Sequence, residues 1–293
     1  MISYNPKDWY KFIFNFHKAD TLRSLAPLML LIAGYSWLVS WLEIEYFRLP
    51  KNEHLKNISS MHNLLSFAIS MLLVFRTNTA YDRWWEGRKL WGALVNNSRN
   101  LAMKLNSMLP DNDKAGRRFF AKTIAMYASI LSQHLGSEET RLALDDAEHP
   151  ELKRLDSTKH LPNQVASLMI HRVNRMYEEG KIKGDQLIIL NGELQSFTDI
   201  CGACERIKNT PIPFSYSVFL KKFIFLYTVT LPFSFAISLG YLAIPVVTII
   251  FYVLASLELI AEEIEEPFGD DPNDLPTGKI ASNIEKHVAE ILY

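Results

Sequence analysis

Long apolar runs alternate with strongly polar stretches along this chain. The run LAPLMLLIAGYSWLVSWL, residues 25–42, contains no charged residue. As a helix it would be about 27 Å long at 1.5 Å per residue, close to the thickness of the hydrocarbon layer of a membrane. Trp37, Trp41 and Tyr46 gather at its far end, as aromatic residues do at a membrane interface. The pattern predicts a transmembrane helix.

A second apolar run, residues 64–75, would be only about 18 Å long as a helix, which is too short to cross lipid alone. Because no Gly or Pro follows until Gly87, we expect the helix to continue through RTNTAYDRWWEGRKLW. Its polar part would then face protein or water rather than lipid. The polar face of this helix, with Asn63, Ser66 and Ser70, and its short apolar length favour packing around an aqueous axis.

The middle of the chain is less apolar. Residues 119–135 include Lys122, Gln133 and His134, so they predict either a buried cytosolic helix or one that is partly embedded in the membrane. The polar stretch 136–165 has loop character, and two amphipathic helices are expected after it. The second of these has an apolar repeat at helical spacing: Leu187, Leu190, Leu194, Phe197, Cys201 and Cys204.

Residues 223–257 form the last apolar block, which is broken once around SLGYLAIP and therefore predicts a helical hairpin with a short turn. Pro232 lies within the first arm, where a membrane helix tolerates it. The acidic stretch that follows ends in a short helix, in which Ser282 and Glu285 have the spacing of a capping box.

The 31 basic and 32 acidic residues nearly balance, so the chain lacks the excess positive charge that nucleic-acid binding requires. The distribution of basic residues is informative, because Lys and Arg concentrate on the cytoplasmic side of membrane proteins. They precede the first apolar run (25–42) and the last apolar block (223–257), and they follow the second run (64–75). This distribution predicts that both termini lie in the cytoplasm. The residues are Lys7, Lys11, Lys18, Arg23, Arg76, Arg83, Arg88, Lys89, Arg99, Lys221 and Lys222.

The sequence shows no catalytic motif. The eight histidines are dispersed, and neither a phosphate-binding glycine loop nor a nucleophile elbow appears. Cys201 and Cys204 could suggest a redox or zinc site, but a thioredoxin-like site needs a strand-to-helix context and zinc needs further ligands. Since both cysteines follow the apolar repeat of a helix, core packing is the simpler interpretation. We expect no enzyme activity.

Two stretches together resemble the bestrophin family. The first is FRTNTAYDRWWEGRKLWG, with Arg83, Trp84 and Trp85, and the second is AEEIEEPFGDDPNDLP, with Pro267, Phe268 and Gly269. The order of the apolar blocks also fits, and the resemblance covers roughly residues 5–292. It implies an all-α integral membrane protein with four transmembrane helices and a cytosolic helical domain, assembled as a homopentamer around one axial pore.

The expected organisation has five segments. They are a cytosolic N-terminal segment (1–24), transmembrane helices 1 and 2 (25–75), a mainly cytosolic helical domain (76–215), transmembrane helices 3 and 4 (216–260), and a cytosolic acidic segment with a helix (261–293). The expected location is the plasma membrane of a bacterium. Animal members of the family conduct anions under calcium control, whereas a studied bacterial type favours cations.

The resemblance implies a hydrophobic neck, three apolar rings upstream of the Arg-Trp motif, which spacing from Arg83 places at Phe67, Met71 and Phe75. These positions share one helix face. The alternative is an ordinary buried stripe of a membrane helix.

The resemblance also implies a lower aperture. Spacing back from Cys201 places it near Asp185, or at Gln186 if the alignment slips by one residue. An Asp185 ring would attract cations; alternatively, Asp185 is the N-cap of its helix.

Acidic residues after Pro-Phe-Gly form a calcium clasp in animal members, and the matching positions here are Asp271 and Asp274, with Glu266 nearby. Carboxylates suit calcium, but Pro272 and Asn273 replace acids in the run, so a solvated acidic turn is the alternative. The expected channel thus requires no cofactor, and its partners are its own copies, lipid and monovalent ions, either chloride or sodium. The rival function is a membrane-anchored scaffold or sensor that conducts no ion.

Overall fold

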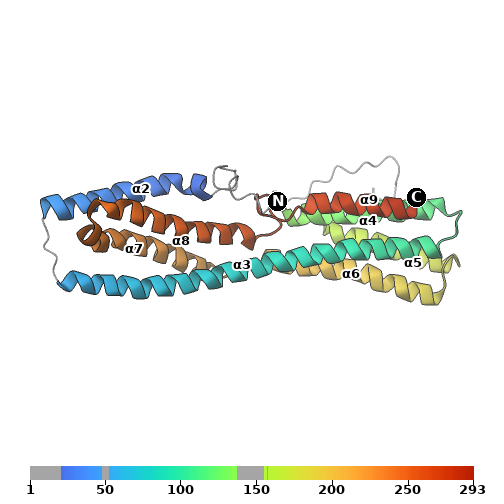
Figure 1. Cartoon of the computed structure of the whole chain (residues 1–293). Helices are drawn as coiled ribbons and strands as arrows, with labels where there is room; N and C mark the ends of the chain where they lie inside the picture. Colours follow the sequence, from blue (N-terminus) through green and yellow to red (C-terminus); the bar gives the residue numbers. More distant parts are fainter. Residues whose placement is uncertain (1–20, 48–52, 137–154, 157) are drawn as a thin grey trace. The chain divides into compact units, whose positions relative to one another are not determined.

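The computed structural model describes residues 21–47, 53–136, 155–156 and 158–293. Every regular element in these residues is helical (Figure 1), which confirms the predicted all-α fold. Most of the predicted N-terminal segment 1–24 and most of the predicted polar loop 136–165 lie outside the described residues.

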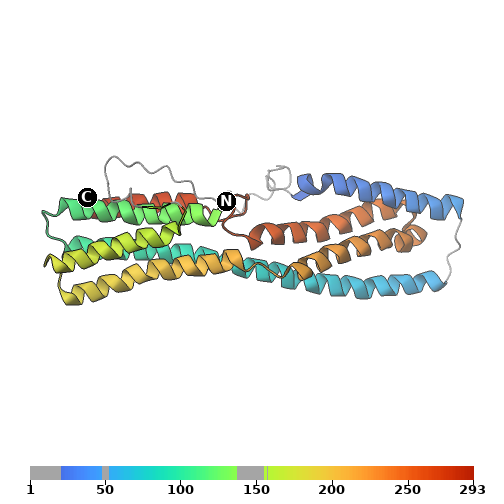
Figure 2. The ribbon, with the colours of Figure 1, turned by 180° about the vertical axis from the view of Figure 1, so that it is seen from behind.

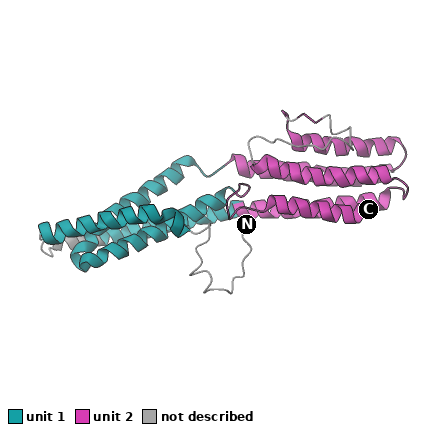
Figure 3. Ribbon diagram, turned by 90° about the horizontal axis from the view of Figure 1, so that it is seen from above, with its two compact units in different colours: residues 1–83, 211–266 teal, residues 84–210, 267–293 magenta. Residues whose placement is uncertain are grey.

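The chain divides into two compact units (Figure 3). Unit 1 consists of residues 1–83 and 211–266, and unit 2 of residues 84–210 and 267–293. The long helix α3 (Glu53–Met108) contributes to both. Because it extends to Met108, it confirms the prediction that the helix continues beyond the second apolar run, where no Gly or Pro occurs before Gly87.

Unit 1 contains the apolar helices. They are α2 (Thr21–Trp41), which ends in a π-helical turn (Leu42–Tyr46), the first part of α3, and the hairpin of α7 (Phe214–Leu239) and α8 (Ala243–Glu265). A single 3₁₀ turn (Gly240–Leu242) connects the hairpin arms, and Gly240 has the positive φ of 60° that this reversal needs. Figures 1 and 2 show α7 and α8 side by side, as predicted.

Three stretches of the described residues are long and apolar enough to cross a membrane: Thr21–Tyr46, Ser60–Met108 and Phe214–Glu265. The third contains both α7 and α8, so unit 1 presents four apolar helices. The small core of this unit takes side chains from each of them: Ile32, Ile69, Leu73, Leu220, Ile224, Tyr227, Leu231, Val247, Phe251 and Leu254.

Hydrogen bonds between helices supplement this small core. The Tyr35 hydroxyl donates to the carbonyl of Val229 (3.1 Å), and the Tyr216 hydroxyl donates to the carbonyl of Leu72 (2.9 Å). His62 Nε2 and Thr230 Oγ1 are 3.0 Å apart. Such bonds hold apolar helices together where the surroundings offer no hydrophobic driving force.

Unit 2 is a second helical bundle. It consists of the remainder of α3, α4 (Lys114–Gly136), α5 (Leu161–Glu178), α6 (Gly184–Asn209) and α9 (Thr277–Leu292). α4 packs against α9 and α5, and α5 packs against α6. Its core is much larger than that of unit 1 and includes the fully buried side chains of Trp91, Leu94, Phe120, Ile124 and Tyr127.

Unit 2 bears on two further predictions. α4 is a core helix buried on most sides, as the buried helix expected for residues 119–135 requires, and its cytosolic location stays a prediction. The predicted cap at Ser282 is wrong, because α9 begins at Thr277, directly after Pro276, and Ser282 lies exposed inside the helix.

Candidate functional site

The α3 segment of unit 1 has two contrasting faces. His62, Ile69, Leu73, Arg76 and Ala80 are each at most 5% exposed and recur at the three- and four-residue spacing of one helix face. This face packs against the other helices of unit 1. The unit is therefore built on one side of α3 only.

The predicted neck residues lie on the opposite face of α3. Phe67 is 72% exposed, Met71 50% and Phe75 54%. Leu64 and Val74 extend the same apolar surface. The neck residues are therefore not a buried stripe within the chain, and a continuous apolar surface of this kind normally contacts lipid or another protein chain. Along its flank, Asn63 and Ser70 are exposed, and the Ser70 hydroxyl bonds the carbonyl of Ser66 (2.7 Å).

Directly after the neck, Arg76 is buried between two carboxylates of α8. Its Nη1 lies 2.7 Å from Glu265 Oε2, and its Nε lies 3.4 Å from Glu258 Oε2. Glu265 also accepts from the backbone N–H of Ile212 (2.6 Å). The guanidinium of Arg76 thus holds the end of α8 against α3, and a carboxylate on each side of it compensates its buried charge.

The two motifs that carry the family resemblance contact each other. Arg83 Nε donates to the carbonyl of Glu265 (3.0 Å) in unit 1. In unit 2, Trp84 Nε1 donates to the carbonyl of Asn273 (3.0 Å). A Cβ at Gly87 would lie 3.1 Å from the Phe268 ring, so glycine lets this ring approach the helix closely. Phe268 is buried beside Leu275 in the core.

The remaining motif residues are arranged as follows. Trp85 stacks on Trp84 with ring centroids 6.5 Å apart and stays 46% exposed. Pro267 is buried and accepts a backbone hydrogen bond from Leu275 (2.9 Å), while Gly269 is exposed. Trp84 therefore links α3 to the turn that follows Pro-Phe-Gly, and Trp85 packs on its outer side.

The acidic turn uses one of its candidate clasp residues internally. Asp274 is 2% exposed, and its Oδ2 accepts from the backbone N–H of Asp271 (2.6 Å). Asp271 is exposed, and Glu266 is exposed and belongs to unit 1. The bond from Asp271 shows that the Asp274 carboxylate stabilises the turn itself.

The predicted aperture residues lie in the first turn of α6. Lys183 is the N-cap, and Gln186 accepts from its backbone N–H (2.8 Å), so the alternative in which Asp185 caps the helix is wrong. Asp185 is exposed, and Ile188, on the same face one turn later, is 74% exposed. Nothing in the sequence indicated that Ile188 is exposed, because it lies within the apolar run from Leu187 to Leu190, which is typical of a buried helix face.

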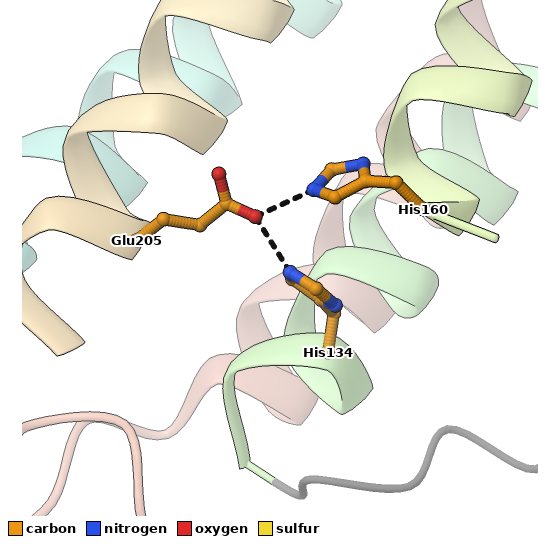
Figure 4. A group of neighbouring side chains, drawn as sticks. All are labelled: His134, His160 and Glu205. Carbon is orange, nitrogen blue, oxygen red and sulfur yellow. Dashed lines mark hydrogen bonds and ion pairs between the residues drawn. The ribbon is translucent and has the colours of Figure 1, made fainter. Parts of the chain in front are cut away.

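Three further side chains converge in unit 2 (Figure 4). His134 Nε2 and His160 Nε2 lie 2.6 Å and 2.5 Å from the same oxygen, Oε1 of Glu205. Burial would raise the pKa of the Glu205 carboxyl, but the hydrogen bonds from both imidazoles outweigh it and hold that pKa below its ordinary value. This is the one group of three or more potential metal-ligating side chains within the described residues.

The neighbouring cysteines are not part of that group. Burial raises the pKa of the Cys201 and Cys204 thiols to about 12 each, so both stay protonated at neutral pH. They lie buried on the inner face of α6 with Leu190, Leu194 and Phe197, as the core-packing interpretation predicted.

Sequence reasoning missed two clusters, the ion pairs of Arg76 and the group around Glu205. For the first of them Glu258 gave a usable signal, because an ionisable residue at the end of an apolar run requires a partner. The His134, His160 and Glu205 cluster gave none, since its members come from the end of α4, the N-cap of α5 and the C-terminal part of α6. Only the packing of three helices brings them together.

Comparison with known proteins gives one consistent result. A profile of the Bacterial/Fungal Bestrophin protein family matches residues 1–290. A voltage-dependent anion channel-forming protein of Nostoc sp. is 36% identical over 230 residues, covering 77% of this chain and 75% of its own. The voltage-dependent anion channel-forming protein YneE of Escherichia coli strain K12 is 31% identical over 288 residues, covering 97% and 92%.

Solved structures agree. A crystal structure of a variant of a bacterial bestrophin homologue from Klebsiella pneumoniae has a TM-score of 0.78 and 26% identity, covering 92% of this chain and 100% of that chain.

Proposed function

Because this chain belongs to the bacterial and fungal bestrophin family, we propose that five copies of it enclose one axial pore that conducts monovalent ions. Membership already makes it a membrane ion channel rather than an enzyme. The proposal adds the number of subunits, the residues that line the pore and the ions that pass.

The exposed apolar face of α3 is the observation that carries the proposal. Phe67, Met71 and Phe75 are held outward by a helix whose other face is anchored in unit 1. Around a five-fold axis they would form three apolar rings one helical turn apart. Such a constriction conducts only when it is wet, and gates by losing its water. Met71 makes the middle ring the most deformable, because its thioether side chain is unbranched and flexible.

The neck would discriminate between ions by hydration more than by charge, so the sign of the permeant ion must be set elsewhere. The relatives from Nostoc sp. and Escherichia coli are named as anion channel-forming proteins. In this chain a ring of exposed Asp185 carboxylates on α6 would favour cations. We therefore propose conduction of monovalent ions, with Asp185 as the residue that biases it toward sodium over chloride.

In the membrane, α2, the first part of α3, α7 and α8 would be the four spanning helices, and unit 2 would be cytosolic with both termini. The basic residues beside the apolar helices support this orientation. The channel would need no cofactor. Currents that are the same in Ca²⁺ and in a chelator are the expected result.

The test is a planar-bilayer recording of the purified oligomer under a NaCl gradient. A reversal potential near the equilibrium potential of Na⁺ supports the cation bias. One near the equilibrium potential of Cl⁻ means that this chain conducts anions, as the names of its relatives say of them. Replacing the neck residues together, F67A, M71A and F75A, should raise the current, because smaller side chains widen and wet the constriction. The matched control is Leu226→Ala, which removes an equally exposed apolar side chain from α7.

Two outcomes would overturn the proposal. Native mass measurement of a complex other than a pentamer contradicts the assembly. Absence of current from a verified, inserted oligomer contradicts conduction and leaves the scaffold function.

A further inference from the structure

His134, His160 and Glu205 come together from three helices of unit 2, and neither the channel mechanism nor the family motifs use them. His134 lies in the last turn of α4, His160 is the N-cap of α5, and Glu205 lies in α6. Their potential ligand atoms all lie within 4.8 Å of one another, and the two imidazole rings have centroids 4.8 Å apart. Figure 4 shows both rings pointing their Nε2 atoms at the carboxylate.

Two imidazole nitrogens and one carboxylate oxygen are a ligand set with a defined preference. Calcium and magnesium prefer oxygen ligands, whereas zinc accepts nitrogen and carboxylate oxygen together, including two histidines with one glutamate and an open fourth position. The geometry points to a Zn²⁺ site formed by His134, His160 and Glu205, with a water molecule as the fourth ligand.

The site is accessible without being fully solvated. The side chains of His134, His160 and Glu205 are 29%, 34% and 28% exposed. An ion can therefore reach the cluster, and solvent can supply the fourth ligand. The ligands come from elements that pack directly, α4 against α5 and α6, and α5 against α6.

The surroundings orient the ligands. Glu205 interacts with the buried, protonated thiol of Cys201, and Tyr127 beside it is anchored to the carbonyl of Phe197 (2.7 Å). Lys208 Nζ donates to the backbone carbonyl of His134 (3.1 Å) rather than to the ligand atoms. Such outer contacts fix ligand geometry at metal sites.

The hydrogen bonds within the cluster show what an ion must displace. The backbone N–H of Asn163 donates to His160 Nδ1 (3.2 Å), so this nitrogen is the acceptor and Nε2 carries the proton that is shared with Glu205. Zn²⁺ would take the place of the Nε2 protons. On His160 the displaced proton would move to Nδ1, through solvent, so that the ring stays neutral and Nδ1 no longer accepts from the Asn163 N–H. Zinc binding should therefore loosen the start of α5 locally while it links α5 to α4 and α6.

The experiment uses the full chain without a histidine tag, purified in detergent and treated with chelator. Titration with ZnCl₂ by calorimetry, and with CoCl₂ by visible absorption, should give one ion per chain, with the intense cobalt bands of a low-coordinate nitrogen-containing site. MgCl₂ and CaCl₂ should not compete. Exchange of the Asn163 amide with deuterium should become faster when Zn²⁺ is bound.

Three variants keep the proposal falsifiable. His160→Asn removes the imidazole but retains an N-cap side chain, so α5 should fold normally. Glu205→Gln and His134→Ala remove the other two ligands. Each should weaken Zn²⁺ binding at least about tenfold, since even loss of an outer partner costs that much at metal sites. The control is His171→Ala, an exposed histidine of α5 outside the cluster.

Stoichiometric binding that is lost in the three variants and kept in His171→Ala supports the site. The proposal is overturned if the folded wild-type chain does not bind Zn²⁺. It is also overturned if His160→Asn and Glu205→Gln bind Zn²⁺ as tightly as the wild type does. None of these measurements depends on ion conduction, so failure of the zinc site and failure of the proposed channel are distinguishable.

Discussion

The two units of this chain use apolar side chains in opposite ways. Unit 1 exposes large apolar side chains on every one of its helices and buries only a small core. Unit 2 buries a large core of aromatic and aliphatic side chains. Its exposed large apolar residues, within the part the structure describes, are Trp85, Met103, Tyr177, Ile188, Ile189 and Tyr293. The proposed placement of unit 1 in lipid and of unit 2 in water would account for this difference, since lipid imposes no penalty on apolar surface and water does.

One ion-pair cluster of unit 1 and one ion pair of unit 2 show the reverse pattern. Unit 1 buries Arg76 between Glu258 and Glu265, with the guanidinium side chain 1% exposed. In unit 2, the pair of Arg206 and Glu86 is 65% and 42% exposed. Where the surroundings are apolar, a charge has to be compensated within the protein. In water, pairing is optional and contributes little.

The largest effect should come from breaking the buried pair. Arg76→Ala leaves two carboxylates without their cation, and we expect a loss of about 3–5 kcal/mol in the free energy of unfolding. Lys221→Ala is the control, because its pair with Glu262 is half exposed (50% and 52%) and should cost at most about 1 kcal/mol. Denaturation in detergent measures both.

A rescue variant sharpens that prediction. Combining Arg76→Ala with Glu258→Gln and Glu265→Gln removes the uncompensated charges and keeps an acceptor for the Ile212 N–H, so part of the lost stability should return. Equal costs for Arg76→Ala and Lys221→Ala would mean that the Arg76 cluster is as well solvated as the Lys221 pair.

The next effect compares identical substitutions in the two cores. Ile124→Ala in unit 2 should cost about 2–5 kcal/mol, because it loses both transfer from water and packing. Ile69→Ala in unit 1 should cost less, since its alternative surroundings are lipid and only the packing part is lost. Hydrogen exchange of α4 and of α3 in detergent or nanodiscs measures the local opening free energy in each variant. Equal losses would contradict the proposed difference in solvent.

Much of the fold was predictable because its strongest signals are local. An uncharged apolar run predicted residues 25–42 as a helix, and the structure places α2 at Thr21–Trp41. The absence of Gly and Pro predicted that α3 is long. Helix starts were less predictable: α6 uses Lys183 with Gln186, and α9 starts after Pro276 and not at Ser282. Several caps are available in such stretches, and tertiary packing selects one.

The candidate site was predictable in part for the same reason. The spacing of Phe67, Met71 and Phe75 placed them on one face, but only the packed bundle shows that this face is the exposed one. The partners of Arg76 and the cluster around Glu205 depend on contacts between residues far apart in the sequence. No local pattern contains that information.

A smaller effect concerns a cap in unit 2. Asp113 Oδ1 accepts from the Gly116 N–H (2.9 Å) at the start of α4, and its Oδ2 lies 3.2 Å from Lys181 Nζ. Burial raises the pKa of Asp113, but this hydrogen bond and Lys181 outweigh it and lower that pKa below its ordinary value. Asp113→Ala should cost about 1 kcal/mol, the usual contribution of a cap.

The pH dependence of this contribution has a definite sign. Because the folded pKa of Asp113 is lowered, its contribution is fully present above the unfolded pKa of about 3.9 and is lost as the pH falls through the folded pKa. The wild type and Asp113→Ala should thus differ at neutral pH and converge in acid, measured by exchange of the first α4 amides. Asp111→Ala, a fully exposed neighbour, should match the wild type throughout. A difference that persists in acid would assign the effect to packing.

The smallest effect concerns the exposed charge of Asp185. Asp185→Asn should reduce the proposed preference for Na⁺ over Cl⁻ in bilayer recordings, while Asp111→Asn, on the loop before α4, should leave it unchanged. The effect should shrink as salt is raised, because the Debye length falls from about 30 Å at 0.01 M to about 3 Å at 1 M. An unchanged reversal potential at low salt would remove Asp185 from the selectivity mechanism. The exposed apolar Ile188, one turn further along α6, would then be the residue on this face most able to restrict the pore, and it would do so by hydration rather than by charge.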